Sequence, residues 1–419
     1  MLPAREPAIS TARCGDVTTH ASTTYAPSAV THEPGHRDRV RPRLSLAAAS
    51  GVAVVLFAVT RVTQAAVLAV AAWTTGRQPL ALLGRSWDSL WYLGIAAHGY
   101  GRTLYFKPGI VHSDLAFFPL YPALVRAVTT LTPLGGGAAG LVVSWTAAAV
   151  AACGIYALGE RLHGRAVGTA LVVLWGLLPH SVVLSMAYTE PVLTAFAAWS
   201  LYAVLNGNWL WAGGLAALAG LSRPNGFAVA TAVVVAAACE AYRGFRRDGH
   251  VSHRLWTGAA LAPLGWSAYV LWVGLRKGDP LGGYFEVQRL WGSRFDLGHG
   301  SLHFVRGLLL HGNRFVFPMT MVIVAAAVLL YALLIADRAP LPLLVHSGVL
   351  LLIALGGSGF FESKPRFLLP AFPLLLPLAC ALVRTARARP WHATVVVCAL
   401  AGLSFVYGAY LVVFAHTPL

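Results

Sequence analysis

The chain has 419 residues, of which 57% are hydrophobic and only 11% are charged, and its mean hydropathy is +0.67. This composition excludes an ordinary soluble globular protein, because too few polar side chains are present to solvate its surface. The net charge of +16 is spread over loops that flank apolar segments, which favours contact with anionic membrane lipids over nucleic acid binding. We therefore expect an integral membrane protein.

Residues 1–43 are rich in Thr, Ser, Pro, Ala and His and lack hydrophobic periodicity, which predicts a disordered tail. Arginines at positions 37, 39, 41 and 43 directly precede the first apolar run and place this tail in the cytoplasm by the positive-inside rule. That run begins too late, and is too long, for a cleaved signal peptide. Residues 44–419 are then predicted to form one polytopic membrane domain.

A helix needs about 20 mostly apolar residues to cross a bilayer. Eleven segments at or somewhat below this length are predicted to do so: 45–72, 138–158, 166–186, 191–206, 209–222, 225–242, 255–275, 315–336, 341–360, 366–383 and 391–415. The apolar stretch 116–131 is short, carries Arg126 and contains two prolines, so we expect it to lie along the membrane interface.

With this assignment, the short basic loops fall on the cytoplasmic side, and two long loops, 73–137 and 276–314, fall on the outer side. The predicted fold is an all-α polytopic membrane protein with about eleven transmembrane helices and interfacial helices in a large first outer loop. Four polar motifs then share the outer side and can form one site: "WDS" (87–89), "YTEP" (188–191), "RPNG" (223–226) and "ESKPR" (362–366).

Asp88 stands among aromatic side chains in "RSWDSLWYLGIAAHGY" (85–100). Such a carboxylate is suited to act as a general base on an acceptor hydroxyl, with the rings excluding water. The alternative is that Asp88 caps a short helix within an interfacial aromatic belt. Trp87, Trp91 and Tyr92 are accordingly either sugar-stacking residues or members of that belt.

Two further acids occur on the outer side. Asp114, in "HSDLAFFPLYP", either caps the interfacial helix or is a second acid that orients a polar substrate or a divalent ion. Glu190 lies at the predicted outer end of one helix, with Pro191 at the start of the next. An acid so near the hydrocarbon is costly unless it is paired, which indicates either a functional group or a turn cap.

The motif "SRPNG" predicts a turn between two helices. Pro224 stops the preceding helix, Asn225 tolerates a left-handed conformation, and Gly226 permits the backbone reversal. Arg223 is the side chain that this turn presents. It either grips a phosphate or extends to lipid headgroups.

Lys364 and Arg366 begin a proline-rich segment that contains Pro370, Pro373 and Pro377. Prolines inside a span leave carbonyl groups unpaired, and neighbouring helices must offset that cost. A lipid phosphate between these two cations and the arginine of "SRPNG" would use their charges. Extension of the side chains to the headgroups is again the alternative.

The histidines do not form HxxxH or HExxH patterns, and the five cysteines form no CxxC, so the sequence predicts no dedicated metal site. A divalent cation held by the acids stays possible. The loop segment 284–300 either covers the site or is a solvated linker with one amphipathic turn.

Taken in order, "WDSLWYLGIAAHGY", "AFFPLYP", "AYTEP", "LSRPNG" and "KPRFLLPAFP" resemble the GPI mannosyltransferase II (PIG-V-like) family over most of residues 85–375. That family belongs to the GT-C glycosyltransferases, polytopic enzymes that use a lipid-phosphate-linked sugar and carry a key acid in the first large outer loop. The resemblance implies Asp88 as catalytic base, with Asp114 and Glu190 as further acids. The Ala, Arg and Gly bias suggests a bacterial member, for which a GPI anchor is not the expected acceptor.

The predicted function is therefore transfer of a sugar, mannose by resemblance, from a polyprenyl-phosphate donor to a hydroxyl of a lipid, glycan or protein, with inversion, at the outer face of the cell membrane. Predicted substrate-binding residues are Trp87, Trp91, Tyr92, Arg223, Asn225, Lys364 and Arg366. The alternatives are a GT-C transferase of another sugar, a protein O-mannosyltransferase, or a transporter of a lipid-linked sugar. Polar residues within the spans are sparse, Arg61 and Gln64 being the clearest, which disfavours the transporter.

Overall fold

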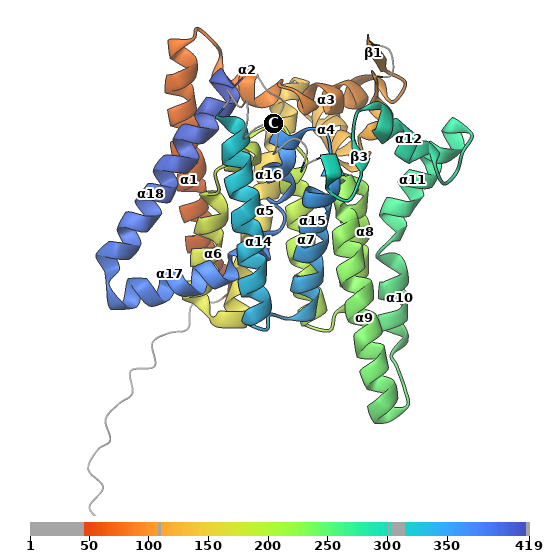
Figure 1. Ribbon diagram of the computed structural model, residues 1–419, viewed down its shortest axis with the longest axis vertical. Helices are drawn as coiled ribbons and strands as arrows, with labels where there is room; N and C mark the ends of the chain where they lie inside the picture. Colours follow the sequence, from red (N-terminus) through yellow and green to blue (C-terminus); the bar gives the residue numbers. More distant parts are fainter. Residues whose placement is uncertain (1–45, 108–109, 301, 303–314, 416–419) are drawn as a thin grey trace, which may run out of the picture. The chain divides into compact units, whose positions relative to one another are not determined.

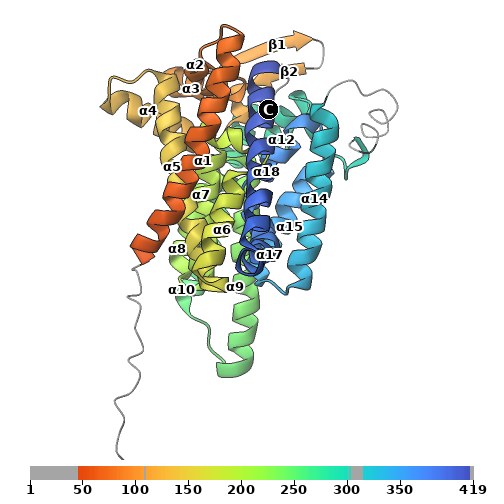
Figure 2. The same cartoon turned by 90° about the vertical axis from the view of Figure 1, so that its left-hand side faces the viewer.

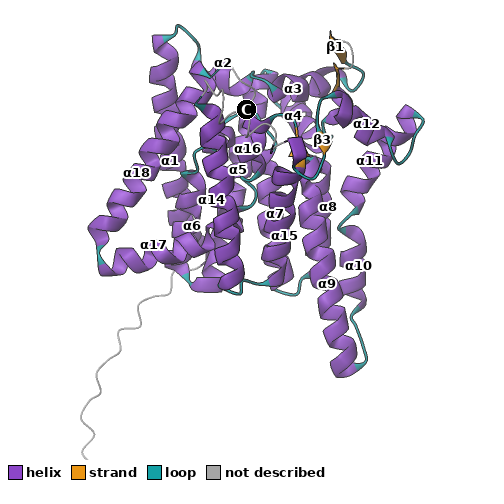
Figure 3. Cartoon of the chain, in the orientation of Figure 1, coloured by secondary structure: helices purple, strands orange, loops and turns teal. Residues whose placement is uncertain are grey.

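The computed structural model describes residues 46–107, 110–300, 302 and 315–415 (Figure 1). The predicted tail, 1–43, lies outside the described residues. The remainder of the chain, Leu44–Leu419, forms one compact unit. Its secondary structure is almost entirely helical, as Figure 3 shows.

Six described spans are long and apolar enough to cross a membrane. They lie on α1 (Leu46–Thr74), α5 (Gly136–His163), α9 (Phe227–Asp248), the consecutive pair α10 (His253–Leu261) and α11 (Leu264–Lys277), α14 (Val316–Ala336) and α18 (Pro390–Ala409), which continues as a π-helical turn, η6 (Tyr410–Phe414). A bent pair, Phe361–Phe367 with Phe372–Ala388, makes seven if it is counted as one span. A multi-pass membrane protein is thereby confirmed.

Four other predicted spans fall on helices of 12 to 16 residues: α6 (Arg165–Gly176), α7 (Glu190–Leu205), α8 (Trp209–Ser222) and α15 (Leu341–Gly356). These are shorter than the ~20 residues that a straight span needs. The total of eleven spans therefore stays a prediction.

The two long loops contain more regular structure than loops usually do. The first carries α2 (Pro79–Gly84), α3 (Asp88–His98), the strands β1 (Thr103–Lys107) and β2 (Ile110–Ser113), the turn η1 (Asp114–Ala116) and α4 (Leu120–Leu131); the second carries α12 (Gly283–Leu290) and β3 (Arg294–Phe295). β1 pairs with β2, and β3 pairs with β4 (Gly357–Ser358), both antiparallel. The all-α prediction is corrected in this respect: β-branched and aromatic residues in 103–113 favour a hairpin over another helix.

The polar motifs and the short basic loops lie at opposite ends of the bundle. Figures 1 and 2 show α2, α3 and the β1–β2 hairpin together at one end, and the α9–α10 and α14–α15 turns at the other. We refer to the first as the α3 end. Which end faces the cytoplasm stays a prediction.

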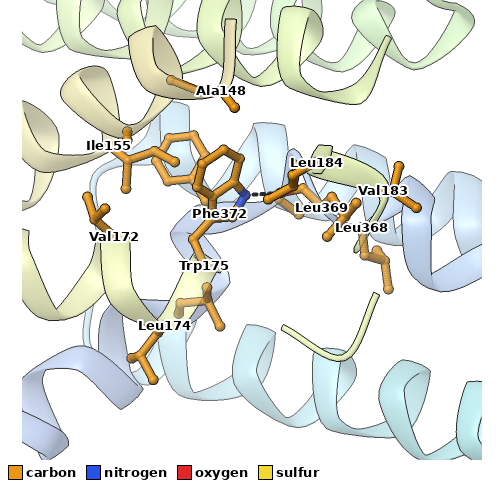
Figure 4. Close-up of a cluster of buried hydrophobic side chains, with 14 of the residues drawn as sticks. Ala148, Ile155, Val172, Leu174, Trp175, Val183, Leu184, Leu368, Leu369 and Phe372 are labelled. Carbon is orange, nitrogen blue, oxygen red and sulfur yellow. Dashed lines mark hydrogen bonds between the residues drawn. The ribbon is translucent and has the colours of Figure 1, made fainter. Parts of the chain in front are cut away.

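The predicted span 366–383 is wrong as a single helix, because the proline-rich segment is broken. It consists of η4 (Phe361–Ser363), α16 (Lys364–Phe367), η5 (Phe372–Leu375) and α17 (Leu376–Ala388), with a bend of 77° at the break. Pro373 has no N–H to donate to the carbonyl of Leu369 four residues earlier. The indole of Trp175 donates to that carbonyl instead, at 3.0 Å (Figure 4). His346 Nε2 donates to the Pro370 carbonyl at 3.0 Å. Neighbouring helices thus offset the cost of the prolines, and the break turns α16 toward the α3 end.

Trp175 lies at the centre of the largest buried hydrophobic cluster. It is fully buried and stacks on Phe57 of α1 at 5.1 Å between ring centroids. Figure 4 shows Ile155, Leu369 and Phe372 around it. One side chain therefore joins four parts of the chain and also satisfies a backbone carbonyl, so its position is fixed by both packing and hydrogen bonding.

The predicted span 166–186 is also wrong as a single helix. α6 ends at Gly176, and Pro179 lacks the N–H that would continue it, so the chain turns into η2 (Ser181–Ser185). Arg61 of α1 donates to the carbonyls of Gly176 and Ser181 and, at 2.6 Å, to Gln64 Oε1. Arg61 therefore braces a helix end, and Gln64 accepts from Arg61 and donates to the Ser404 carbonyl at 3.4 Å.

Replacing Arg61 by Met is expected to destabilise the protein by about 2–6 kcal/mol, because two buried carbonyls lose their donor at about 1–3 kcal/mol each. The apparent unfolding temperature in detergent should fall clearly. Thr63→Val, an exposed change on the same helix, is the control and should have little effect. Equal unfolding temperatures for the two variants would show that Arg61 is no brace.

Candidate functional site at the α3 end

Four charged side chains from separate parts of the sequence meet at the α3 end, and we refer to them as the charged cluster: Asp88, Glu190, Arg223 and Arg366. Asp88 is the first residue of α3 and Glu190 the first of α7. Arg223 is the residue directly after α8, and Arg366 lies on the short helix α16. The structure therefore brings together all four polar motifs that the sequence predicted to share a site, "WDS", "YTEP", "RPNG" and "ESKPR".

Arg366 connects the two acids of the cluster. Its Nη2 lies 2.7 Å from Asp88 Oδ2, and its Nε lies 3.7 Å from Glu190 Oε1. Glu190 Oε1 also forms an ion pair with Nη1 of Arg223. Two carboxylates and two guanidiniums are thus arranged with formal charges that cancel, which is the condition under which charges tolerate burial.

The acids differ in how far solvent and substrate can reach them. The Glu190 side chain is 1% exposed and the two arginines are each 9% exposed, whereas 20% of the Asp88 side chain is exposed. A substrate hydroxyl can therefore reach Asp88 without displacing the cluster. Glu190 instead holds the two arginines in place from behind.

Aromatic side chains contact the charged cluster at Arg366. The Arg366 guanidinium lies 5.4 Å from the ring centroids of both Tyr188 and Phe367, a cation–π arrangement. Burial raises the pKa of Tyr188 well above its usual value, and Asp88 raises it further, while Arg366 acts in the opposite direction. Burial likewise raises the pKa of Tyr92. Both phenols stay protonated, which leaves a carboxylate as the proton acceptor.

The turn that presents Asp88 is strained. Trp87, the residue before α3, has φ +50° and ψ −116°, a region that bulky residues avoid at a cost of about 1–3 kcal/mol. Its side chain packs against the main hydrophobic cluster, which holds the conformation. Trp87 thus orients the start of α3. Asp88 is the first helical residue of α3 and not its N-cap, which is Trp87, so the predicted capping role is corrected.

The "RPNG" turn connects α8 to α9 as predicted, but its backbone conformation differs from the prediction. Gly226 has φ −59°, and Asn225 is not left-handed, so the turn needs no positive φ. A Cβ on Gly226 would lie 2.1 Å from the carbonyl oxygen of Ala219. Glycine is therefore required because α9 begins in close contact with α8. Asn225 is buried, and its Nδ2 has no hydrogen-bond partner among the residues that the structure describes.

Lys364 is held by the backbone of the neighbouring helix end. Its ammonium donates to the carbonyls of Ala354 and Gly357 at 2.6 and 2.7 Å. Cations at a helix C-terminus are favourable partners for the carbonyls that have no helical donor. Lys364 therefore joins α16, and with it Arg366, to the end of α15.

Asp114 and Trp91 lie beside a cavity of about 180 Å³ between α3 and the hairpin, which we refer to as the α3 cavity; its lining includes Trp91, Gly94, His98, Tyr100, Arg102 and Asp114. Asp114 does not cap α4, which begins at Leu120. The prediction from sequence missed Tyr188, the cavity and Arg102. Of these, only Tyr188 had a local signal, as the neighbour of Thr189 and Glu190 in "YTEP".

Across residues 46–107, 110–300 and 315–415, no three His, Cys, Asp or Glu side chains are grouped as metal ligands. The two acids of the charged cluster both face guanidiniums.

No protein-family model and no curated protein sequence matches the chain. Among solved structures, it is similar to the Archaeoglobus fulgidus oligosaccharyltransferase in complex with Zn and sulfate, with a TM-score of 0.45 and 14% identity over 86% of this chain and 54% of that one. It is also similar to the archaeal oligosaccharyltransferase AglB from Archaeoglobus fulgidus in complex with an inhibitory peptide and a dolichol-phosphate, with a TM-score of 0.49 and 13% identity over 87% and 56%. The chain thus spans about half the length of these proteins. At this level of likeness, its function has to be inferred from its own residues.

Proposed function

We propose that the chain is a GT-C-type membrane glycosyltransferase that moves a sugar, mannose in the first instance, from a polyprenyl-phosphate donor to a hydroxyl acceptor. The observation that carries the proposal is the pairing of a reachable carboxylate, Asp88, with a buried guanidinium, Arg366, at one end of a membrane helix bundle. A base and a phosphate-binding cation are the two groups that this reaction requires.

In the proposed reaction, Asp88 accepts the proton of the acceptor hydroxyl while the hydroxyl oxygen attacks the anomeric carbon. The bond between that carbon and the phosphate oxygen breaks, and its electron pair leaves with the lipid phosphate. Attack from the side opposite the leaving group inverts the anomeric configuration. The products are the glycosylated acceptor, polyprenyl phosphate and a protonated Asp88, which solvent then deprotonates.

The leaving phosphate is proposed to bind at Arg366. Nη1 of this side chain is buried and has no hydrogen-bond partner within the described residues, so its N–H groups lack an acceptor that a phosphate oxygen would supply. Arg223 lies behind the same carboxylate, Glu190, and adds a second positive charge. Lys364 contributes by keeping α16 in place.

The site is proposed to face the outside of the cell. Nucleotide sugars are absent there, which requires a donor anchored in the membrane, and the basic loops at the opposite end fit a cytoplasmic location. A protein O-mannosyltransferase or a transferase of another sugar would use the same groups. The transporter alternative stays disfavoured, because the two clearest polar residues within a span bond to each other and Arg61 bonds to a helix end.

The proposal is tested by supplying radiolabelled short-chain polyprenyl-phosphate sugars to sealed vesicles that contain the protein. Mannose, glucose and galactose donors are compared, in right-side-out and inverted vesicles. We expect label in a membrane or protein product from one donor, only in right-side-out vesicles. Absence of transfer from all donors after permeabilisation would refute the enzyme class, and transfer only in inverted vesicles would refute the orientation.

A further inference from the structure

The α3 cavity has no part in the proton and phosphate chemistry described above. It lies between α3 and the segment that leads into the hairpin, and its volume is about 180 Å³. That corresponds to about six water molecules at ~30 Å³ each, the size class of a single sugar ring. Gly94 and Gly101 keep it open, since a Cβ on Gly101 would meet nothing within 4 Å and one on Gly94 only the end of the Arg102 side chain.

The cavity lies on the same face of α3 as Asp88. Trp91, Ile95 and His98 line it, and they follow Asp88 at intervals of three, four and three residues, the spacing of one helix face. Trp91 is one turn after Asp88, ~4.5 Å along the helix axis. Trp91 is thus the lining residue nearest to Asp88 along α3, and the cavity extends from it toward the C-terminal end of the helix.

Asp114 supplies an unpaired acceptor to this cavity. Its Oδ2 accepts the backbone N–H groups of Gly101 and Arg102, both at 2.8 Å, which fixes the carboxylate. Its Oδ1 is buried and has no hydrogen-bond partner among residues 46–107, 110–300 and 315–415. A buried carboxylate oxygen without a donor is rare in a finished protein interior and is satisfied when a ligand hydroxyl donates to it.

The guanidinium of Arg102 and the aromatic rings of Trp91 and Tyr100 complete the lining. The Arg102 guanidinium lies 5.2 Å from the centroid of the Trp91 ring. Phe117 stacks on Trp91 at 5.8 Å. Tyr100 is held by donation of its hydroxyl to the Phe117 carbonyl at 2.8 Å, so it presents its ring to the cavity. The aromatic walls are thus fixed before a ligand arrives.

This combination selects among ligand classes. An anion would meet the Asp114 carboxylate, and a cation would meet Arg102. An apolar ligand would leave Asp114 Oδ1 without a hydrogen-bond donor. A neutral polyhydroxylated ring satisfies all groups: a hydroxyl donates to Asp114, Arg102 donates to a ring or hydroxyl oxygen, and the C–H faces contact the aromatic rings.

We propose that the α3 cavity binds one sugar ring of the acceptor, so that the acceptor is a glycan or glycolipid. This rests on the proposed glycosyltransferase function and makes it more specific. The bound ring presents a hydroxyl toward the start of α3, where Asp88 accepts its proton.

The test is a binding measurement without turnover. Methyl α-mannopyranoside, methyl α-glucopyranoside and methyl β-galactopyranoside are added to the purified full chain in detergent, and saturation-transfer NMR reports binding. Wild type is expected to bind at least one. Gly94→Leu, which fills the cavity, and Asp114→Asn, which removes the charge while retaining an oxygen for the two N–H groups, should each bind about tenfold more weakly.

Gly214→Leu is the matched control. Gly214 is also a glycine inside a helix, and a Cβ there meets nothing within 4 Å, so binding should be unchanged. If wild type binds none of the glycosides, if Gly94→Leu binds as wild type does, or if inorganic phosphate displaces the glycoside, the cavity is not an acceptor sugar site.

The two proposals fail separately. Glycoside binding that depends on Gly94 and Asp114, in a protein that transfers no sugar from any donor, would overturn the proposed reaction and keep the sugar site. Conversely, transfer activity whose acceptor KM is unaffected by Gly94→Leu would keep the reaction and overturn the sugar site.

Discussion

Asp88→Asn is expected to reduce sugar transfer by about 10²–10⁴-fold, the usual contribution of a general base. Asparagine has the shape of aspartate and cannot accept the proton. Because 20% of the Asp88 side chain is exposed, folding should be affected much less than activity. The measurement is the initial rate with the labelled donor, together with the unfolding temperature of each variant. The donor KM should change little, since the proposed phosphate ligand is Arg366.

Glu286→Gln is the matched control for this prediction. Glu286 is a half-exposed acid of α12 that also forms an ion pair with an arginine, Arg289, but it lies outside the charged cluster. Its rate should equal that of wild type. If the rate of Asp88→Asn is close to those of Glu286→Gln and wild type, another group is the base and the proposed mechanism is wrong.

Glu190→Gln is expected to destabilise the protein by about 3–5 kcal/mol. Its carboxylate faces both Arg223 and Arg366 and is 1% exposed, so its neutralisation leaves buried positive charge without compensation. The apparent unfolding temperature in detergent should fall markedly. Activity of the remaining folded protein should fall as well, because Arg366 then has one anchor fewer.

The control for this effect is Glu240→Gln on α9. Glu240 and Arg243 form an ion pair at 3.8 Å with both side chains more than half exposed, and such pairs contribute about 0–1 kcal/mol. A double variant, Glu190→Gln with Arg223→Gln, should recover part of the lost stability, because one uncompensated charge is removed with its partner. Equal unfolding temperatures for Glu190→Gln and Glu240→Gln would show that the cluster does not hold the fold.

The charged cluster explains how a chain with so few acids can place two arginines at the membrane boundary. Each arginine has a carboxylate partner from another helix, and one carboxylate, that of Glu190, serves both. The exposed member, Asp88, then stands against a cation whose position is already fixed. Preorganisation of this kind lowers the cost of binding a phosphate beside a base.

Composition and hydropathy were sufficient to predict a multi-pass helical membrane protein, because the bilayer imposes length and polarity on each span separately. Asp88, Glu190, Arg223 and Arg366 do gather, as their ion pairs show; the sequence predicted this by assigning their motifs to one side of the membrane. These properties are local or additive along the chain. Each of these properties follows from the composition of single segments and their order along the chain.

Only the tertiary structure decided which partner each polar group has. Lys364, expected at a phosphate, bonds to the carbonyls of Ala354 and Gly357. Asp114 fixes the backbone beside the α3 cavity. The predicted spans 166–186 and 366–383 are interrupted at prolines. Side chains from other helices bond to backbone carbonyls at these breaks, Arg61 to that of Gly176 and Trp175 to that of Leu369. Hydrogen bonds and ion pairs between distant segments depend on distances in space, and hydrophobic periodicity along the chain carries no information about those distances.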